Sequence, residues 1–215
     1  MNHARYLVVG GHTRSIGKTA LVVDLIRAFP GAEWTAVKIT QYGHGVCSEH
    51  GEPCDCASAT HPAILDEERD RSGQTDTSRF LVAGARRSLW LRTRQGDLAE
   101  GMPLLRKALA GAGNVILESN AVLGFLRPAL FLVVLDPEIE DFKESTQRYL
   151  DRADAFVFRN PLPEEAWEGV SGRLLRAKPA FEHRLGAAPP AELVAMVQER
   201  MFAVRNQEGR GIGNY

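Results

Sequence analysis

Residues 10–19 read Gly10-Gly11-His12-Thr13-Arg14-Ser15-Ile16-Gly17-Lys18-Thr19. An apolar run at residues 5–9 precedes them and predicts a buried strand. Residues 18–29 follow, with apolar side chains at helical spacing, and predict a helix that a Pro-Gly pair ends. A glycine-rich turn between a strand and a helix, closed by Gly-Lys-Thr, is the context of a phosphate-binding P-loop.

The chemistry of such a loop comes from its backbone and from two side chains. Its N–H groups and the positive end of the helix create an anion site. We expect Lys18 to reach the terminal phosphates, with a catalytic role, and Thr19 to give its hydroxyl to Mg²⁺. The sequence thus predicts Mg²⁺ with ATP or GTP as ligand, bound by Gly11, Arg14, Ser15, Ile16, Gly17, Lys18, Thr19 and Ala20.

The spacing of the loop departs from the commonest pattern. That pattern has four residues between the first glycine and Gly-Lys-Thr, and here His12 falls at the glycine position. Counted from Gly11, five residues intervene. The alternative interpretation is a glycine-rich turn with a chance Gly-Lys-Thr.

Composition excludes several classes of protein. The 215 residues are 44% hydrophobic and 25% charged, with a net charge of -1 and a pI near 6.6. These values are ordinary for a soluble domain and favour neither a nucleic-acid nor an anionic-membrane partner. The apolar run at the amino end is too short for a signal peptide and no run of membrane-spanning length exists, so we expect a cytoplasmic protein.

Apolar runs alternate with amphipathic segments along the chain. Strands are predicted at residues 34–40, 87–91, 114–117, 129–135 and 155–158, with an edge strand within 174–181. Helices are predicted at 76–85, with Asp76 as N-cap, and at 98–109, 139–150 and 189–204. The alternation predicts an α/β fold with a doubly wound, mostly parallel sheet flanked by helices. We expect one nucleotide-binding domain over residues 1–205, a Cys/His-rich loop insertion at 41–62 and a disordered tail at 206–215.

Several segments resemble known P-loop proteins. The five-residue spacing is similar to that of the dethiobiotin synthetase family. Residues 37–40, 73–79, 83–85 and 118–120 resemble segments of the MobB family, the molybdopterin-guanine dinucleotide biosynthesis proteins B, although Ser119-Asn120 stands where MobB has glycine. The resemblance implies a P-loop NTPase fold and a homodimer with nucleotide at its interface.

Further candidate site residues follow predicted strands. Glu118 ends a buried strand, where a carboxylate can coordinate Mg²⁺ or orient water. Asp136 has similar geometry, with capping of a turn as the alternative. Lys38 and Asp76 can both reach the site. The alternatives are that Lys38 is solvated and that Asp76 is the N-cap of a helix. Relatives imply that Asn160 contacts the base, but the Lys and Asp of a guanine-specific motif are missing after it, and an Asn-Pro turn is the alternative.

The insertion concentrates potential metal ligands: His44, Cys47, His50, Cys54 and Cys56. Three thiolates and one histidine complete a tetrahedral Zn²⁺ site, and three cysteines can also hold an iron–sulfur cluster with a ligand from elsewhere. The two histidines compete for the fourth position. The alternative is a loop with unpaired thiols.

These features predict a slow Mg²⁺-dependent NTPase that acts with a protein partner in the assembly of a cofactor or metal centre, such as the molybdenum cofactor. One alternative is a small-molecule ATP-dependent enzyme of the dethiobiotin synthetase type, with an acceptor pocket lined by Lys38 and Arg79. Another is a non-catalytic nucleotide- or metal-binding module.

Overall fold

The computed structural model describes residues 4–42, 63–162 and 167–203. Within these residues one sheet contains the strands β1 (Arg5–Gly11), β2 (Thr35–Tyr42), β3 (Ala63–Glu67), β4 (Arg87–Arg94), β5 (Asn114–Glu118), β6 (Leu130–Leu135), β7 (Ala155–Phe158) and β8 (Ala180–Glu182). Their order is β3-β4-β2-β5-β1-β6-β7-β8. Every pair is parallel except β3 with β4, so the predicted, mostly parallel sheet is confirmed.

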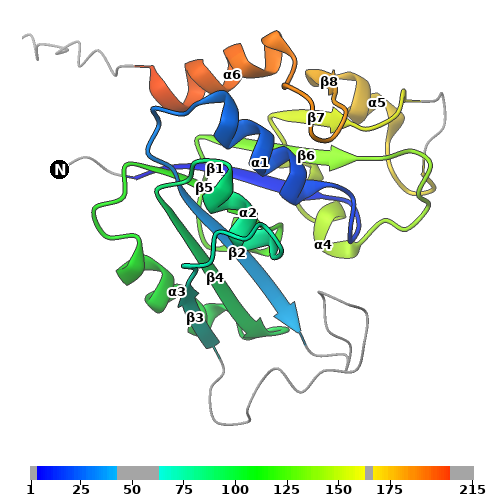
Figure 1. Cartoon of the computed structure of the whole chain (residues 1–215). Coiled ribbons are helices and arrows are strands. Elements are labelled where there is room, and N and C mark those ends of the chain that lie inside the picture. Colours follow the sequence, from blue (N-terminus) through cyan, green and yellow to red (C-terminus); the bar gives the residue numbers. More distant parts are fainter. Residues whose placement is uncertain (1–3, 43–62, 163–166, 204–215) are drawn as a thin grey trace, which may run out of the picture.

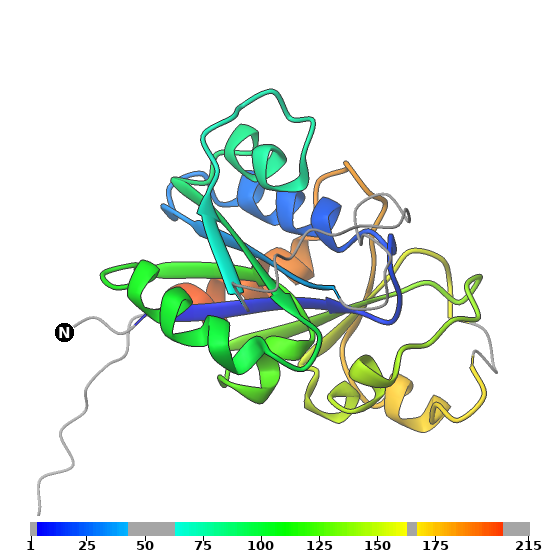
Figure 2. The same cartoon turned by 90° about the horizontal axis from the view of Figure 1, so that it is seen from below.

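Helices cover both faces of the sheet (Figures 1 and 2). One face carries α1 (Lys18–Ala28), α2 (Asp76–Val82) and α6 (Ala191–Phe202). The other carries α3 (Leu98–Ala108), α4 (Glu144–Gln147), α5 (Gly172–Arg176) and the 3₁₀ turns η1 (Ala121–Gly124) and η2 (Leu150–Arg152). None of the helices in the described ranges combines the length and hydrophobicity needed to cross a bilayer.

The central strand β1 is apolar because both of its faces are covered. Leu7 and Val9 pack in the cluster beneath α1 and α6, whereas Val8 packs on the opposite side with α3. Successive side chains of a strand point to opposite faces, so a strand buried on both sides needs a continuous apolar run. This run fixes β1 in the middle of the sheet and places the turn at Gly10 and Gly11 at its carboxyl edge.

The prediction of one helix over residues 139–150 is wrong. Only α4 and the turn η2 are helical there, and residues 137–143 follow an irregular path. The backbone N–H of Lys143 donates to the His12 carbonyl at 2.8 Å, and that of Ile139 to the Asp136 carbonyl at 3.1 Å. Tertiary contacts with the loop after β1 thus outweigh the helical preference of the segment.

Three smaller expectations also need correction. The N-cap of α2 is Thr75, whose hydroxyl accepts from the Ser78 N–H at 3.1 Å, and not Asp76. The last edge strand is confined to Ala180–Glu182, and much of the segment before it forms α5. β3, antiparallel at the edge of the sheet, lies where no regular structure was predicted.

Candidate phosphate-binding site

The loop between β1 and α1 turns through two residues of positive φ, Ser15 at 51° and Gly17 at 99°. The positive φ of Gly17 favours glycine there, and the absence of a Cβ lets the exposed side chain of Leu185 approach the loop. α1 has no side-chain N-cap and no acidic residue in its first turn. Its first N–H groups therefore lack an intrahelical partner and are available to an anion.

Asn120 fastens the beginning of this loop. Its Oδ1 accepts from the Gly11 N–H at 3.1 Å, and its Nδ2 donates to the Gly11 carbonyl at 2.9 Å. The Thr146 hydroxyl donates a hydrogen bond to the same carbonyl at 2.8 Å. A Cβ on Gly10 would lie 2.1 Å from Asn120 Oδ1, so glycine allows this close approach. No role was predicted for Asn120, although a polar amide stands just beyond a buried strand in the sequence.

His12, at the usual glycine position of the pattern, is fully buried. Its ring lies 5.2 Å from that of Phe142 and 5.0 Å from that of Trp167. Nε2 accepts from the Asp136 N–H at 3.1 Å, so Nδ1 carries the proton and donates to the Asp141 carbonyl at 2.7 Å. Burial lowers the pKa of His12 below its ordinary 6.5, consistent with this neutral form.

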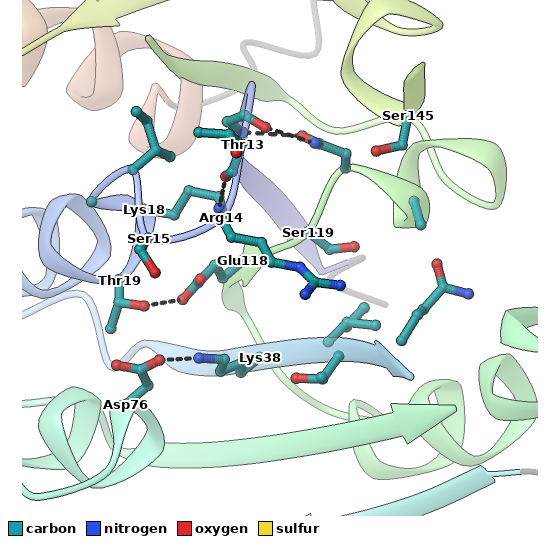
Figure 3. Close-up of a pocket in the computed structure, with 18 of the residues that line it drawn as sticks. Thr13, Arg14, Ser15, Lys18, Thr19, Lys38, Asp76, Glu118, Ser119 and Ser145 are labelled. Carbon is teal, nitrogen blue, oxygen red and sulfur yellow. Dashed lines mark hydrogen bonds and ion pairs between the residues drawn. The ribbon is translucent and has the colours of Figure 1, made fainter. Parts of the chain in front are cut away.

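Lys18, Arg14 and Lys143 are three of the cationic side chains that line one cleft. The Lys18 ammonium donates to the Thr13 carbonyl at 2.8 Å, and burial is the main cause that lowers its pKa. Arg14 lies beside it (Figure 3), and Lys143 lines the same cleft. Burial first, and then the charges of Lys18 and Arg14, lower the pKa of Lys143 to about 8. Mutual repulsion of this kind is relieved by a polyanion.

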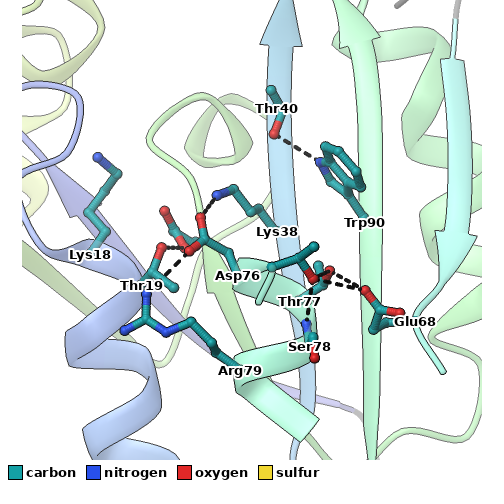
Figure 4. Close-up of polar contacts among 12 residues, drawn as sticks. Lys18, Thr19, Lys38, Thr40, Glu68, Asp76, Thr77, Ser78, Arg79 and Trp90 are labelled. Carbon is teal, nitrogen blue, oxygen red and sulfur yellow. Dashed lines mark hydrogen bonds and ion pairs between the residues drawn. The ribbon is translucent and has the colours of Figure 1, made fainter. Parts of the chain in front are cut away.

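Oxygen ligands lie next to these cations. Thr19 donates its hydroxyl to the buried Glu118 carboxylate at 2.7 Å. Mg²⁺ in phosphate sites is typically held by one or two protein oxygens together with phosphates and waters, so this pair fits the ion. Lys38, the register partner of Glu118 on β2, forms an ion pair with Asp76, which Arg79 also approaches at 3.4 Å (Figures 3 and 4).

The predicted loop residues, Gly11, Arg14, Ser15, Ile16, Gly17, Lys18, Thr19 and Ala20, all line this cleft together with Glu118. Its volume is about 1480 Å³, which exceeds the range of about 300–1,000 Å³ usual for a single ligand. The cleft thus has room for a triphosphate and for a second molecule.

Two predicted residues lie elsewhere. Neither Asn160 nor Asp136 is among the residues that line the cleft. Asn160 donates to Asp136 Oδ1 at 2.9 Å, and the same oxygen accepts from the Glu138 N–H at 3.1 Å. The Asp136 carboxylate therefore caps the turn after β6, and Asn160 is held against it.

The predicted metal ligands His44, Cys47, His50, Cys54 and Cys56 all lie outside the described residues. Across the described ranges, no group of three or more His, Cys, Asp or Glu side chains is placed to hold a metal ion. A Mg²⁺ ion at Thr19 and Glu118 would accordingly complete its shell with phosphate oxygens and water.

A mostly parallel sheet flanked by helices, with a Gly-Lys-Thr loop leading from its central strand into a helix, is the fold of the P-loop NTPases. No protein-family model matches the chain, and no curated protein matches it. Among solved structures, the chain is similar to LpxK from Aquifex aeolicus, whose "apo" form was crystallised in complex with ATP. The sequences are 16% identical and the TM-score is 0.46, over 83% of this chain and 53% of that one. This chain thus spans about half the length of that protein.

Proposed function

We propose that this protein binds a nucleoside triphosphate with Mg²⁺ at the β1–α1 loop and acts on its terminal phosphate. The observation that carries the proposal is the convergence of Lys18, Arg14 and Lys143 beside the open amino end of α1, with Thr19 and Glu118 adjacent. Oriented N–H groups, half-buried ammonium groups and a hydroxyl–carboxylate pair are together complementary to a Mg²⁺-bound triphosphate.

The residues have distinct roles in this function. Lys18 exchanges the Thr13 carbonyl for phosphate oxygens and neutralises charge that develops on the transferring group. Thr19 and Glu118 hold the ion, which supplies further charge neutralisation when bound. Phosphoryl transfer depends mainly on positioning and electrostatics, so the chain supplies a pre-arranged site with no covalent step of its own.

The finer assignment is a slow NTPase, using ATP or GTP, in the assembly of a cofactor or metal centre. It rests on the MobB-like segments. A protein partner, a homodimer and a cytoplasmic location go with this assignment and stay predictions. So does the Zn²⁺ or iron–sulfur site of the Cys/His loop, which elemental analysis of the purified protein tests.

A second function is favoured by the size of the cleft. An acceptor molecule beside the terminal phosphate would make this a small-molecule ATP-dependent enzyme, with Lys38 and Arg79 on the acceptor side. Phosphate release that a small metabolite stimulates favours this function. Release that only a protein partner stimulates favours the assembly role.

Binding of a non-hydrolysable ATP or GTP analogue with Mg²⁺, measured by calorimetry, tests the common proposal. Lys18→Ala should lower affinity by about tenfold or more, since a charge-assisted contact contributes about 1.5–3 kcal/mol. Lys107→Ala, at an exposed lysine of α3 away from the cleft, is the matched control and should bind as the wild type does. If Lys18→Ala binds both analogues unchanged, the phosphate-loop assignment is wrong.

A further inference from the structure

We propose that Lys143 is a second phosphate-binding lysine, which contacts the terminal phosphate of the bound nucleotide, and that His12 and Thr13 position it. This inference rests on the proposed function and goes beyond it, since the Gly-Lys-Thr motif supplies Lys18 alone. It assigns a ligand to the β6–α4 segment, residues 136–143, which the sequence predicts as partly helical.

The phosphate loop itself holds this segment. The Lys143 N–H donates to the His12 carbonyl at 2.8 Å. Thr13 donates its hydroxyl to the Asp141 carboxylate, and His12 Nδ1 donates to the Asp141 carbonyl at 2.7 Å. Both the backbone and the side chain of Asp141 are thus engaged by the loop, two residues before Lys143. Motion of the loop would carry Lys143 with it.

The far side of the segment is fixed as well. Trp167 packs on the His12 ring at 5.0 Å and donates its indole N–H to the Ile139 carbonyl at 2.7 Å. His12 Nε2 accepts from the Asp136 N–H at 3.1 Å, at the beginning of the segment. One buried imidazole therefore contacts both ends of residues 136–143, which explains a histidine where the usual pattern has glycine.

The charges that face Lys143 select a strong anion. Lys18 on α1 and Arg14 in the loop are positive, and both lower the pKa of Lys143. Asp141, on its own segment, is the carboxylate that acts in the opposite direction, and it already accepts from Thr13. An ammonium group that burial and two cations oppose is stabilised when an anion binds beside it. Lys18 is assigned to the terminal phosphates of the nucleotide. Lys143 lines the same cleft close enough for the charge of Lys18 to lower its pKa, so we assign Lys143 to the last of these phosphates.

The test compares Lys143→Gln, Lys143→Arg and the control Lys107→Gln for affinity toward Mg²⁺ complexes of a non-hydrolysable triphosphate and of the diphosphate. Lys143→Gln should lower the affinity for the triphosphate about tenfold and leave the affinity for the diphosphate unchanged. The affinities of Lys143→Arg and of the control should stay close to those of the wild type. Unchanged affinity for both nucleotides would overturn the proposal, leaving an anion of a second substrate as the ligand of Lys143. Equal losses for both would also overturn it, because an inner phosphate is then the partner.

The positioning role has its own readout. Thr13→Val and His12→Gln should each lower the ratio of triphosphate to diphosphate affinity. Combined with Lys143→Gln, each should add no further loss to this ratio, because both act through the same ammonium group. Additive losses, or equal weakening of both nucleotides, would show a merely structural role.

A pH series provides a second measurement. Wild-type affinity for the triphosphate should fall as the pH rises through about 8, where the free Lys143 loses its proton. The affinity of Lys143→Arg should fall less steeply, because its guanidinium keeps its charge across this range. Identical profiles would contradict the contact. A wild type that binds neither nucleotide would instead refute the underlying function.

Discussion

Thr19 donates its hydroxyl to Glu118 at 2.7 Å, although 99 positions separate the two residues. β1 and β5 are neighbours in the sheet, and Val9 is the register partner of Glu118. Because all the strands near β1 are parallel, the loop after β1 and the carboxylate that ends β5 emerge at the same edge. The sheet order thus creates the hydroxyl–carboxylate pair that fits Mg²⁺.

Glu118→Gln tests this pair while preserving the shape of the side chain. The amide cannot offer a charged oxygen, so Mg²⁺ should enhance triphosphate binding much less, and phosphate release should fall by roughly 100-fold. Binding without Mg²⁺ should not weaken, since a negative charge near the phosphates is removed. Calorimetry with and without Mg²⁺ separates the two effects. Glu192→Gln, on the exposed side of α6, should leave all of them unchanged.

Asn120→Ala should destabilise both the fold and the phosphate loop. It removes contacts to the N–H and to the carbonyl of Gly11 in a partly buried place, at a cost of about 1–3 kcal/mol in the free energy of unfolding. Urea denaturation measures this loss. Nucleotide affinity should fall as well.

The matched control for that change is Asn114→Ala. Asn114 donates to the Ala32 carbonyl at 2.8 Å and is not among the residues that line the cleft. Loss of this hydrogen bond should lower the free energy of unfolding by less, about 0.5–1.5 kcal/mol, and nucleotide affinity should be preserved. Equal effects of the two variants on affinity would contradict the role given to Asn120.

The strand and the helix on either side of the loop could be predicted from local patterns for a physical reason. A buried strand, a glycine turn and an amphipathic helix are contiguous in sequence, and so are the N–H groups that create an anion site. Glu118 was predictable because it ends an apolar run. Asn120 and Lys143 were not predictable, because their places depend on contacts between distant positions. Asn120 contacts Gly11, 109 positions away. The segment that carries Lys143 is held by the hydrogen bond between Thr13 and Asp141, which are 128 positions apart. The periodicity of apolar residues in a sequence does not predict such long-range contacts.

The misplaced N-cap of α2 shows a different limit. Thr75 and Asp76 are adjacent, and both residue types favour the N-cap. The choice depends on tertiary contacts: the Asp76 carboxylate pairs with Lys38 on β2, which leaves the Thr75 hydroxyl to accept from the Ser78 N–H. The long-range ion pair therefore decides a boundary that local preference leaves open.

Stability should fall on acidification, in part through His12. Its pKa in the folded protein lies below 6.5, the ordinary value that the unfolded chain regains. Between these two values the unfolded state binds more protons, so stability falls as the pH drops below 6.5. The slope from this one group is at most about 1.4 kcal/mol per pH unit. Above pH 7 the contribution is fully present.

Urea denaturation of the wild type and of His12→Gln between pH 5 and 8 isolates this contribution. Asp136 and Asp141, the carboxylates near the ring, are retained in the variant, so the comparison changes the imidazole alone. The wild type should lose more stability than the variant between pH 7 and 5.5. Parallel curves would contradict a neutral, buried His12.

The Lys38–Asp76 pair should tune triphosphate affinity through charge. Lys38 lowers and Asp76 raises the pKa of Lys18, so both act electrostatically on the phosphate site. Asp76→Asn removes a negative charge and should raise triphosphate affinity by about two- to tenfold, whereas Lys38→Met should lower it by a similar factor. Both shifts should shrink at high salt.

Opposite signs distinguish this electrostatic role from a structural one. If the pair mainly held α2 against β2, the two single variants would weaken binding alike, whatever charge each removed. The double variant should lie near the wild type under the electrostatic role, because the two charge changes cancel. Asp66→Asn, which breaks the Asp66–Arg92 ion pair between β3 and β4, is the control. Neither residue of that pair lines the cleft, so its loss should leave triphosphate affinity unchanged at every salt concentration.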